Sequence, residues 1–389
     1  MTAVSIPYSP SVLPAGVRSR FFHGVNGITV HLLEAGFEPP GNPLLLLLHG
    51  FPELAYSWRN VLPGLAAAGY HAVAPDVRGF GRSGGTDATF ETDPGAYSTL
   101  TKVRDALWLV AALGYRSVEA VIGHDAGAGI AAWCALARPD VFRSVALMSA
   151  PFGGPPTIPF NTNGGGEPAG AFAPRPADLN ADLATLSPPR KHYQAYYSTK
   201  EANHDMWLCP QGVHAFLRGY YHYKSADWKQ NRPFPLKGLT ADELAQLPKY
   251  YVMDLERTMA ETVAEIMPSA VEIAACGWLP DRELAVYAEE YQRTGFQGGL
   301  QAYRWNTGPG APAELSLFSG RTLDVPACFI SGEADWGNYQ VPGAIDRMRD
   351  SACTRFRGTH FVEGAGHWVQ QEQPARVTEL LLAFLRDQT

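Results

Sequence analysis

The segment from residue 118 to residue 137 most constrains what this chain can fold into. It reads VEAVIGHDAGAGIAAWCALA, an apolar run followed by a glycine-rich turn and an alanine-rich stretch. This order predicts a strand over 118–122, a sharp turn centred on Asp125, and a helix over 127–137. Glycine allows the strained backbone that lifts a side chain out at the end of a strand. An aspartate presented there is a candidate nucleophile, because a carboxylate that attacks carbon becomes an ester that must then be hydrolysed.

Strand and helix patterns alternate on both sides of this turn. A weakly alternating segment, 28–34, predicts an early antiparallel strand, whereas short continuous apolar runs predict buried strands. Strands that alternate with helices imply right-handed crossovers, and hence an α/β fold with a mostly parallel sheet and helices on both faces. The further predicted strands are 43–48, 71–75, 143–149, 325–332 and 355–363, and the predicted helices lie around 58–65, 97–113 and 374–386.

The alternation stops near residue 151 and resumes near residue 325. We therefore predict a core formed by residues 1–150 and 321–389, with a largely helical cap inserted over 151–320. The cap begins with a glycine- and proline-rich stretch, 152–189. Because a structureless loop of that length is improbable inside a compact domain, we interpret this stretch as a tether to the cap.

Composition narrows the classes of partner. The chain has 389 residues, of which 46% are hydrophobic and 18% charged, and its net charge of -7 argues against nucleic acid or an anionic membrane as a partner. Its five cysteines are scattered without C-x-x-C spacing, so they predict neither a disulfide framework nor a zinc site. Residues 1–20 do not resemble a signal peptide, and the apolar run 44–48 is too short to span a bilayer. A cytoplasmic location is predicted, and the sequence leaves monomer and homodimer open.

Two further candidate catalytic residues follow predicted strands. Asp335 comes after the strand over 325–332, and His367 comes after the strand over 355–363. The carboxyl ends of parallel strands meet at one edge of a sheet, so these side chains are expected to lie near Asp125. The order nucleophile, acid, histidine is that of the α/β-hydrolase fold. His367 is then the predicted general base, and Asp335 the residue that orients it.

The turn HGFP, residues 49–52, supplies another part of the predicted site. It follows a buried strand directly, as the turn at Asp125 does. The backbone N–H groups of Phe51 and Ala126 are therefore predicted to form an oxyanion hole, one from each loop.

Several motifs resemble those of epoxide hydrolases of the α/β-hydrolase fold. They are HGFPE at 49–53, GHDAGA at 123–128 and GAGHW at 364–368. In the cap, GFQGGLQAYR at 295–304 is similar to a family segment that ends in a ring-opening tyrosine, and this role falls on Tyr303. HYQAYY at 192–197 resembles the segment that carries the partner tyrosine, and this role falls on Tyr193, although Tyr196 and Tyr197 are close enough to compete. A third aromatic cluster, Tyr220, Tyr221 and Tyr223, is assigned to packing.

The resemblance implies hydrolysis of a small epoxide by water to a vicinal diol. An opening epoxide develops an alkoxide, and two phenol O–H groups can hydrogen-bond this oxygen and supply a proton. The mechanism implied for the family requires no metal and no organic cofactor.

Three alternative functions differ in how well they fit these residues. A haloalkane or haloacid dehalogenase also uses an aspartate, but such enzymes often place Trp or Arg after it, where this chain has Ala126. A serine esterase fails because no serine stands at the turn. A non-catalytic ligand-binding protein on the same fold has no need for Asp125, Asp335 and His367 together. Many epoxide hydrolases also have Trp where this chain has Ala126, so the floor of the pocket is expected to be wider than usual.

Overall fold

An eight-stranded sheet forms the centre of the molecule. The computed structural model describes residues 6–158 and 176–387, and the strands run in the order β1-β2-β4-β3-β5-β6-β9-β10. Strand β2 pairs antiparallel with β1 and β4, and all other pairs in this sheet are parallel. The strands are β1 Arg18–Val25, β2 Ile28–Ala35, β3 Leu44–Leu48, β4 His71–Pro75, β5 Ala120–His124, β6 Val145–Met148, β9 Ala327–Gly332 and β10 Phe356–Val362.

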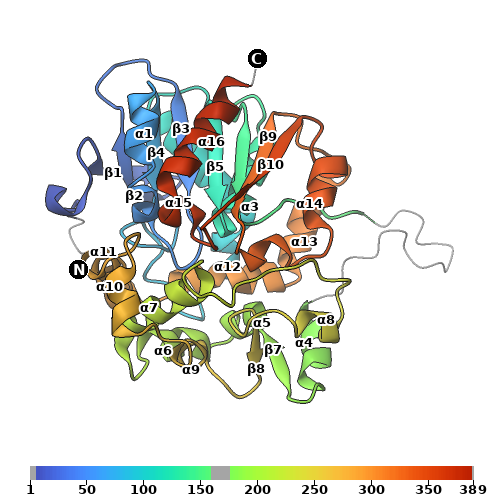
Figure 1. The fold of residues 1–389 in the computed structure, drawn as a ribbon. Helices are drawn as coiled ribbons and strands as arrows, with labels where there is room; N and C mark the ends of the chain where they lie inside the picture. The colour runs from blue at the N-terminus through green and yellow to red at the C-terminus, as the bar shows by residue number, and fades with distance from the viewer. Residues whose placement is uncertain (1–5, 159–175, 388–389) are drawn as a thin grey trace.

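Helices cover both faces of this sheet. Figure 1 shows α16 in front of the strands and α3 behind them. Central strands such as β3, whose sequence is LLLLL, are buried along their whole length because they face helices on both sides. The helices that flank the sheet are α1 Leu62–Ala67, α2 Thr99–Ala112, α3 Ala126–Ala137, α14 Ala344–Arg347, α15 Val369–Glu372 and α16 Pro374–Arg386.

A second layer, built mainly of short helices, lies across one end of the sheet. Its described part begins at residue 176 and occupies the lower half of Figure 1. A two-stranded antiparallel ribbon pairs β7 with β8. The elements are α4 Pro176–Ala184, β7 Arg190–His192, α5 Tyr193–Tyr197, α6 Glu201–Trp207, α7 Gly212–Lys224, α8 Ala241–Leu244, β8 Val252–Asp254, α9 Met259–Ala264, α10 Ala270–Ala275, α11 Asp281–Thr294, α12 Gln297–Thr307 and α13 Gly310–Leu315. Within the two described ranges, no helix is both long and apolar enough to cross a membrane.

The structure confirms the predicted mostly parallel sheet and differs from the sequence prediction in three places. Strand β1 was not predicted, and it pairs with β2 through the Asn26–Gly27 turn, where both residues have positive φ. The helix expected around 58–65 is divided into a 3₁₀ turn, Ala55–Trp58, and α1. The predicted tether over 152–189 is wrong where α4 forms, and its residues 159–175 lie outside the described part of the chain.

Candidate active site

The turn between β5 and α3 holds Asp125 in a strained conformation. Its φ of 53° and ψ of -121° lie in a region that L-residues rarely adopt. Two glycines make the turn possible. A Cβ at Gly123 would lie 2.1 Å from the Gly127 carbonyl oxygen, and one at Gly127 would lie 2.3 Å from the Leu48 carbonyl oxygen. The predicted sharp turn is therefore present, and only glycine fits on either side of it.

The loop after β3 lies directly against this carboxylate. The Phe51 N–H donates a hydrogen bond of 3.0 Å to Oδ1 of Asp125. A Cβ at Gly50 would lie 2.4 Å from that same oxygen, so the backbone can approach only because residue 50 has no side chain. Ala126 is the first residue of α3, and its N–H has no acceptor within the helix. One of the two predicted oxyanion donors thus already binds Oδ1, and the other stands beside the carboxylate in sequence.

His367 lies between the two predicted acids. Its Nδ1 is 3.1 Å from Oδ1 and 3.2 Å from Oδ2 of Asp335, and its Nε2 is 3.4 Å from Oδ2 of Asp125. Because Nδ1 faces a carboxylate, we assign a proton to Nδ1. Within the described chain, no residue makes a well-aligned hydrogen bond to the buried Nε2. Nε2 is therefore the ring nitrogen that lies beside Asp125.

Both carboxylates are held in the charged form. Burial alone would raise their pKa values, but the hydrogen bond and charge of His367 act in the opposite direction and lower the pKa of Asp125 and of Asp335. The Gly337 N–H also donates to Asp335, at 2.7 Å. The charge of Lys224 further lowers the pKa of Asp125. An ionised Asp125 is the form required of a nucleophile.

Tyr193 and Tyr303 come from separate helices of the second layer, α5 and α12, and meet above Phe51. Their ring centroids are 6.0 Å apart, and the ring of Tyr303 lies 5.5 Å from that of Phe51. Burial raises the pKa of both phenols well above the usual range, and the negative charge of Asp125 raises both further. Both phenols therefore keep their protons at neutral pH and can act as hydrogen-bond donors.

The two competing tyrosines have hydroxyl groups engaged elsewhere. The Tyr196 hydroxyl donates to Asp205 at 2.9 Å, and the Tyr197 hydroxyl donates to the Tyr220 hydroxyl at 3.2 Å. In contrast, the Tyr303 hydroxyl has no hydrogen-bond partner among the described residues, and the Tyr193 hydroxyl accepts a hydrogen bond from Gln194 at 3.1 Å. These contacts favour Tyr193 over Tyr196 and Tyr197 as the partner of Tyr303.

Helix α12 is seated on the core through glycines. A Cβ at Gly298 would lie 2.2 Å from the Gly79 carbonyl oxygen, and a Cβ at Gly79 would lie 2.5 Å from the Gly298 carbonyl oxygen. A Cβ at Gly299 would lie 2.8 Å from the Phe80 ring. The two backbones are therefore in direct contact, and this contact fixes how far Tyr303 stands from the core.

Comparison with known proteins places this arrangement in a family. The family model described as alpha/beta hydrolase fold matches residues 43–164. Over 369 residues, the chain is 31% identical to epoxide hydrolase B of Mycobacterium tuberculosis, a match that covers 92% of this chain and 96% of that protein. The chain belongs to the epoxide hydrolases. An epoxide hydrolase of Caballeronia sordidicola is 28% identical over 364 residues, with 93% and 92% of the two chains covered.

Solved epoxide hydrolase structures share the fold over nearly the full length. The chain matches an epoxide hydrolase from an endophytic Streptomyces with a TM-score of 0.72 and 31% identity, covering 96% of each chain. It matches potato (Solanum tuberosum) epoxide hydrolase I with a TM-score of 0.70 and 28% identity, covering 95% of this chain and 99% of that one. The α/β-hydrolase fold and the assignment as a hydrolase are thereby confirmed, and an epoxide and water fit as reactants. The cytoplasmic location and the lack of a metal requirement stay predictions, and monomer and homodimer both stay open.

One residue near the site of this epoxide hydrolase was not singled out from the sequence. Lys224, at the end of α7, is buried, and its Nζ lies 5.0 Å from the ring centre of Tyr251 and 5.3 Å from that of Trp368. The preceding cluster of Tyr220, Tyr221 and Tyr223 was assigned to packing; burial raises the pKa of Tyr220, and the Asp125 charge raises it further. A lysine that ends an aromatic run was the available signal, since aromatic faces attract a cation.

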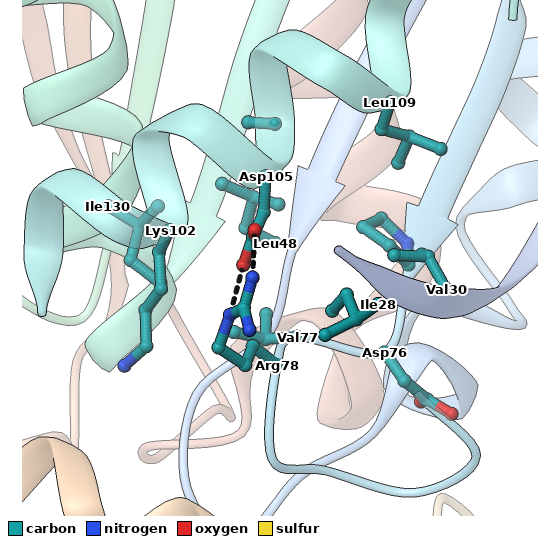
Figure 2. Close-up of a pocket in the computed structure, with 12 residues that line it drawn as sticks. Ile28, Val30, Leu48, Asp76, Val77, Arg78, Lys102, Asp105, Leu109 and Ile130 are labelled. Carbon is teal, nitrogen blue, oxygen red and sulfur yellow. Dashed lines mark hydrogen bonds and ion pairs between the residues drawn. The ribbon is translucent and has the colours of Figure 1, made fainter. Parts of the chain in front are cut away.

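A separate cavity lies away from these residues. Figure 2 shows the side chains that line this cavity, among them the ion pair of Arg78 and Asp105. The cavity has a volume of about 30 Å³, and Arg78 Nε is 2.8 Å from Asp105 Oδ2. Burial lowers the pKa of Lys102, which also lines it, to about 8. None of the five predicted catalytic side chains lines this cavity. Its volume holds about two water molecules, which is too small for a substrate site.

Proposed function

We propose that this epoxide hydrolase acts through an ester on Asp125 and releases a vicinal diol. In the first step, Asp125 Oδ2 attacks an epoxide carbon and the ring C–O bond breaks. Tyr193 and Tyr303 hydrogen-bond the ring oxygen, and one of them gives it a proton. The neutral state of both phenols, favoured by burial and by the Asp125 charge, supports this role.

In the second step, His367 activates water. Its Nε2 takes a proton while the water oxygen attacks the ester carbon of Asp125, and Asp335 stabilises the resulting imidazolium. The negative charge then develops on Oδ1, the oxygen that already accepts the Phe51 N–H. The Ala126 N–H supplies the second donor. Collapse of this intermediate breaks the bond between the ester carbon and Oδ2, and the imidazolium of His367 protonates the departing Oδ2, so the diol leaves with the original Oδ2. The proton left on the new carboxyl group of Asp125 then returns to the tyrosine that protonated the ring oxygen.

The different contacts of the two carboxylate oxygens of Asp125 carry this proposal. Oδ1 is bound by a backbone amide at 3.0 Å, whereas Oδ2 lies 3.4 Å from Nε2 of His367. A nucleophile that becomes an ester needs one oxygen free to attack and the other placed in an oxyanion site. We further propose that the second layer acts as a cap over this site, because it supplies both tyrosines.

The test is intact-mass analysis of His367→Ala with a panel of small epoxides and, separately, with haloalkanes. Without its base the variant should retain the ester, so we expect a mass increase equal to a whole epoxide that maps to Asp125. The wild-type enzyme and Asp125→Asn serve as controls that should show no stable adduct. An adduct formed only from a haloalkane, with release of halide, would replace epoxide hydrolysis with dehalogenation. If a folded variant formed no adduct with either panel, the covalent mechanism would be rejected.

A single turnover in H₂¹⁸O gives a second readout. The mechanism places the water oxygen in the Asp125 carboxylate and leaves the first diol unlabelled. Label in the diol of the first turnover would instead show direct attack of water on the epoxide.

A further inference from the structure

The loop that carries His367 is built against the second layer as well as against the core. The His367 N–H donates to the carbonyl of Lys224 at 2.9 Å, and the indole N–H of Trp368 donates to the carbonyl of Tyr221 at 2.9 Å. The rings of Tyr221 and Trp368 are packed with centroids 4.4 Å apart. Both acceptors belong to α7, so this helix helps to fix the backbone of the base.

The carboxyl group of Glu372 joins the loop that carries His367 to the end of α7. Burial raises the pKa of this group to about 8, although the amides that it accepts act in the opposite direction. Glu372 Oε2 accepts the N–H of Gly366 at 3.0 Å and the N–H of Ala226 at 2.8 Å, and Oε1 accepts the N–H of Trp368 at 3.0 Å. The carboxyl group therefore binds the amides on both sides of His367 and a third amide just beyond α7. A buried backbone N–H group without a hydrogen-bond acceptor is costly, so the three contacts together stabilise one geometry of the loop that carries His367.

The backbones at this junction are in direct contact. A Cβ at Gly366 would lie 2.5 Å from the carbonyl carbon of Ser225 and 2.6 Å from the Ala226 nitrogen. The loop can therefore sit in this position only with glycine at 366. Because Glu372 binds residues on both sides of this contact, it holds the base-bearing loop and the end of α7 together.

We propose that Glu372 is a positioning residue for the general base, which it holds at the distance from Asp125 needed for hydrolysis of the ester. This inference rests on the function proposed above, in which His367 acts in the second step and not in the first. Glu372 itself does not touch the reacting atoms. Loss of its hydrogen bonds should therefore slow the hydrolysis of the ester and leave the formation of the ester unchanged.

The test compares both steps in Glu372→Gln by rapid mixing with an epoxide and quenched intact-mass analysis. Glutamine keeps the size of the side chain, but its NH₂ group faces an amide N–H and cannot accept it. We expect the rate of ester formation to stay within about twofold of wild type, and ester hydrolysis to fall by about tenfold or more, because small misplacements of catalytic groups have large effects on rate. The ester should then accumulate. Glu379→Gln on the exposed face of α16 is the matched control.

A second variant keeps the proposal open to rejection if Glu372→Gln folds poorly. Trp368→Phe removes the indole donor to Tyr221 and should produce the same selective loss, to a smaller extent. An equal fall in both steps in either variant would show general damage to the fold and overturn the positioning role, as would an unchanged rate of hydrolysis. If wild-type protein formed no ester with any epoxide, the proposed function would fail instead, independently of Glu372.

Discussion

Replacement of Gly298 by alanine should separate the position of Tyr303 from its chemistry. A Cβ at residue 298 would lie 2.2 Å from the Gly79 carbonyl oxygen, and contacts below 3.0 Å essentially do not occur. The backbones must therefore separate by about 0.8 Å. Tyr303 lies five residues further along the same helix, about 7.5 Å at 1.5 Å per residue, so it moves with this end of α12.

A displacement of this size should slow the opening of the ring. Misplacement by about 1 Å can cost about 10²-fold in rate, or about 2.7 kcal/mol of transition-state stabilisation. We therefore expect Gly298→Ala to reduce the rate of ester formation by about this factor, measured by rapid mixing and intact mass. Hydrolysis of the ester should be unaffected, because His367 lies on a different element.

The matched control is Gly129→Ala on α3, since a Cβ there meets nothing within 4 Å. It should retain the wild-type rate. Formation of the ester by folded Gly298→Ala at the wild-type rate would refute the claim that the glycine contact sets the height of Tyr303. If Gly298→Ala yields no folded enzyme, Gly299→Ala takes its place. A Cβ at Gly299 would meet the Phe80 side chain at 2.8 Å, a milder clash than that of Gly298 with the backbone.

Two further predictions concern the tyrosines and the stability of the core. Tyr193→Phe should slow ester formation by about 10²-fold or more, whereas Tyr196→Phe should change it little because that hydroxyl is bound to Asp205; similar rates for the two variants would exclude Tyr193. Burial alone would raise the pKa of Glu34, but hydrogen bonds from His71 and two arginines lower it from 4.5 to about 2. Its stabilisation is therefore complete above pH 4.5 and lost as pH falls towards 2. The pKa shift sets an upper limit of about 3 kcal/mol on the contribution of Glu34 to the free energy of unfolding. About half of that is expected, because the arginines are partly exposed and solvent screens their charges. Urea unfolding of wild type and Glu34→Gln should converge at low pH, and a constant difference would contradict this.

The local sequence was sufficient to predict the elements that carry the triad. The glycines around Asp125 are required by contacts as short as 2.1 Å, so the sequence pattern and the geometry report the same constraint. Asp125, Asp335 and His367 were each predicted to follow a strand and therefore to lie near one another, and their side chains do meet in space. Their predicted roles remain proposals, although all three side chains lie within contact of one another through His367.

The contacts of the second layer were beyond local patterns. Three tyrosines fall within 193–197, and no periodicity tells which hydroxyl is already bound to another side chain. The same limit applies to Glu372, which reaches an amide 146 residues away, and to α4, whose sequence reads as part of a glycine- and proline-rich stretch. Helix α4 contacts β7 and α8, and such tertiary contacts stabilise a helix that propensity alone does not predict.

The long connection between the neighbouring strands β6 and β9 has a consequence for the evolution of such proteins. Val145 pairs with Ala327, so about 180 residues are accommodated between two adjacent strands of one sheet. Loop-closure entropy rises by only about 0.6 kcal/mol for each doubling of length, so this connection costs about 2.5 kcal/mol more than one of ten residues. A sheet can therefore exchange, lengthen or rebuild the whole segment at this junction at small thermodynamic cost. Substrate preference can diversify there while the strands that present Asp125, Asp335 and His367 stay as they are.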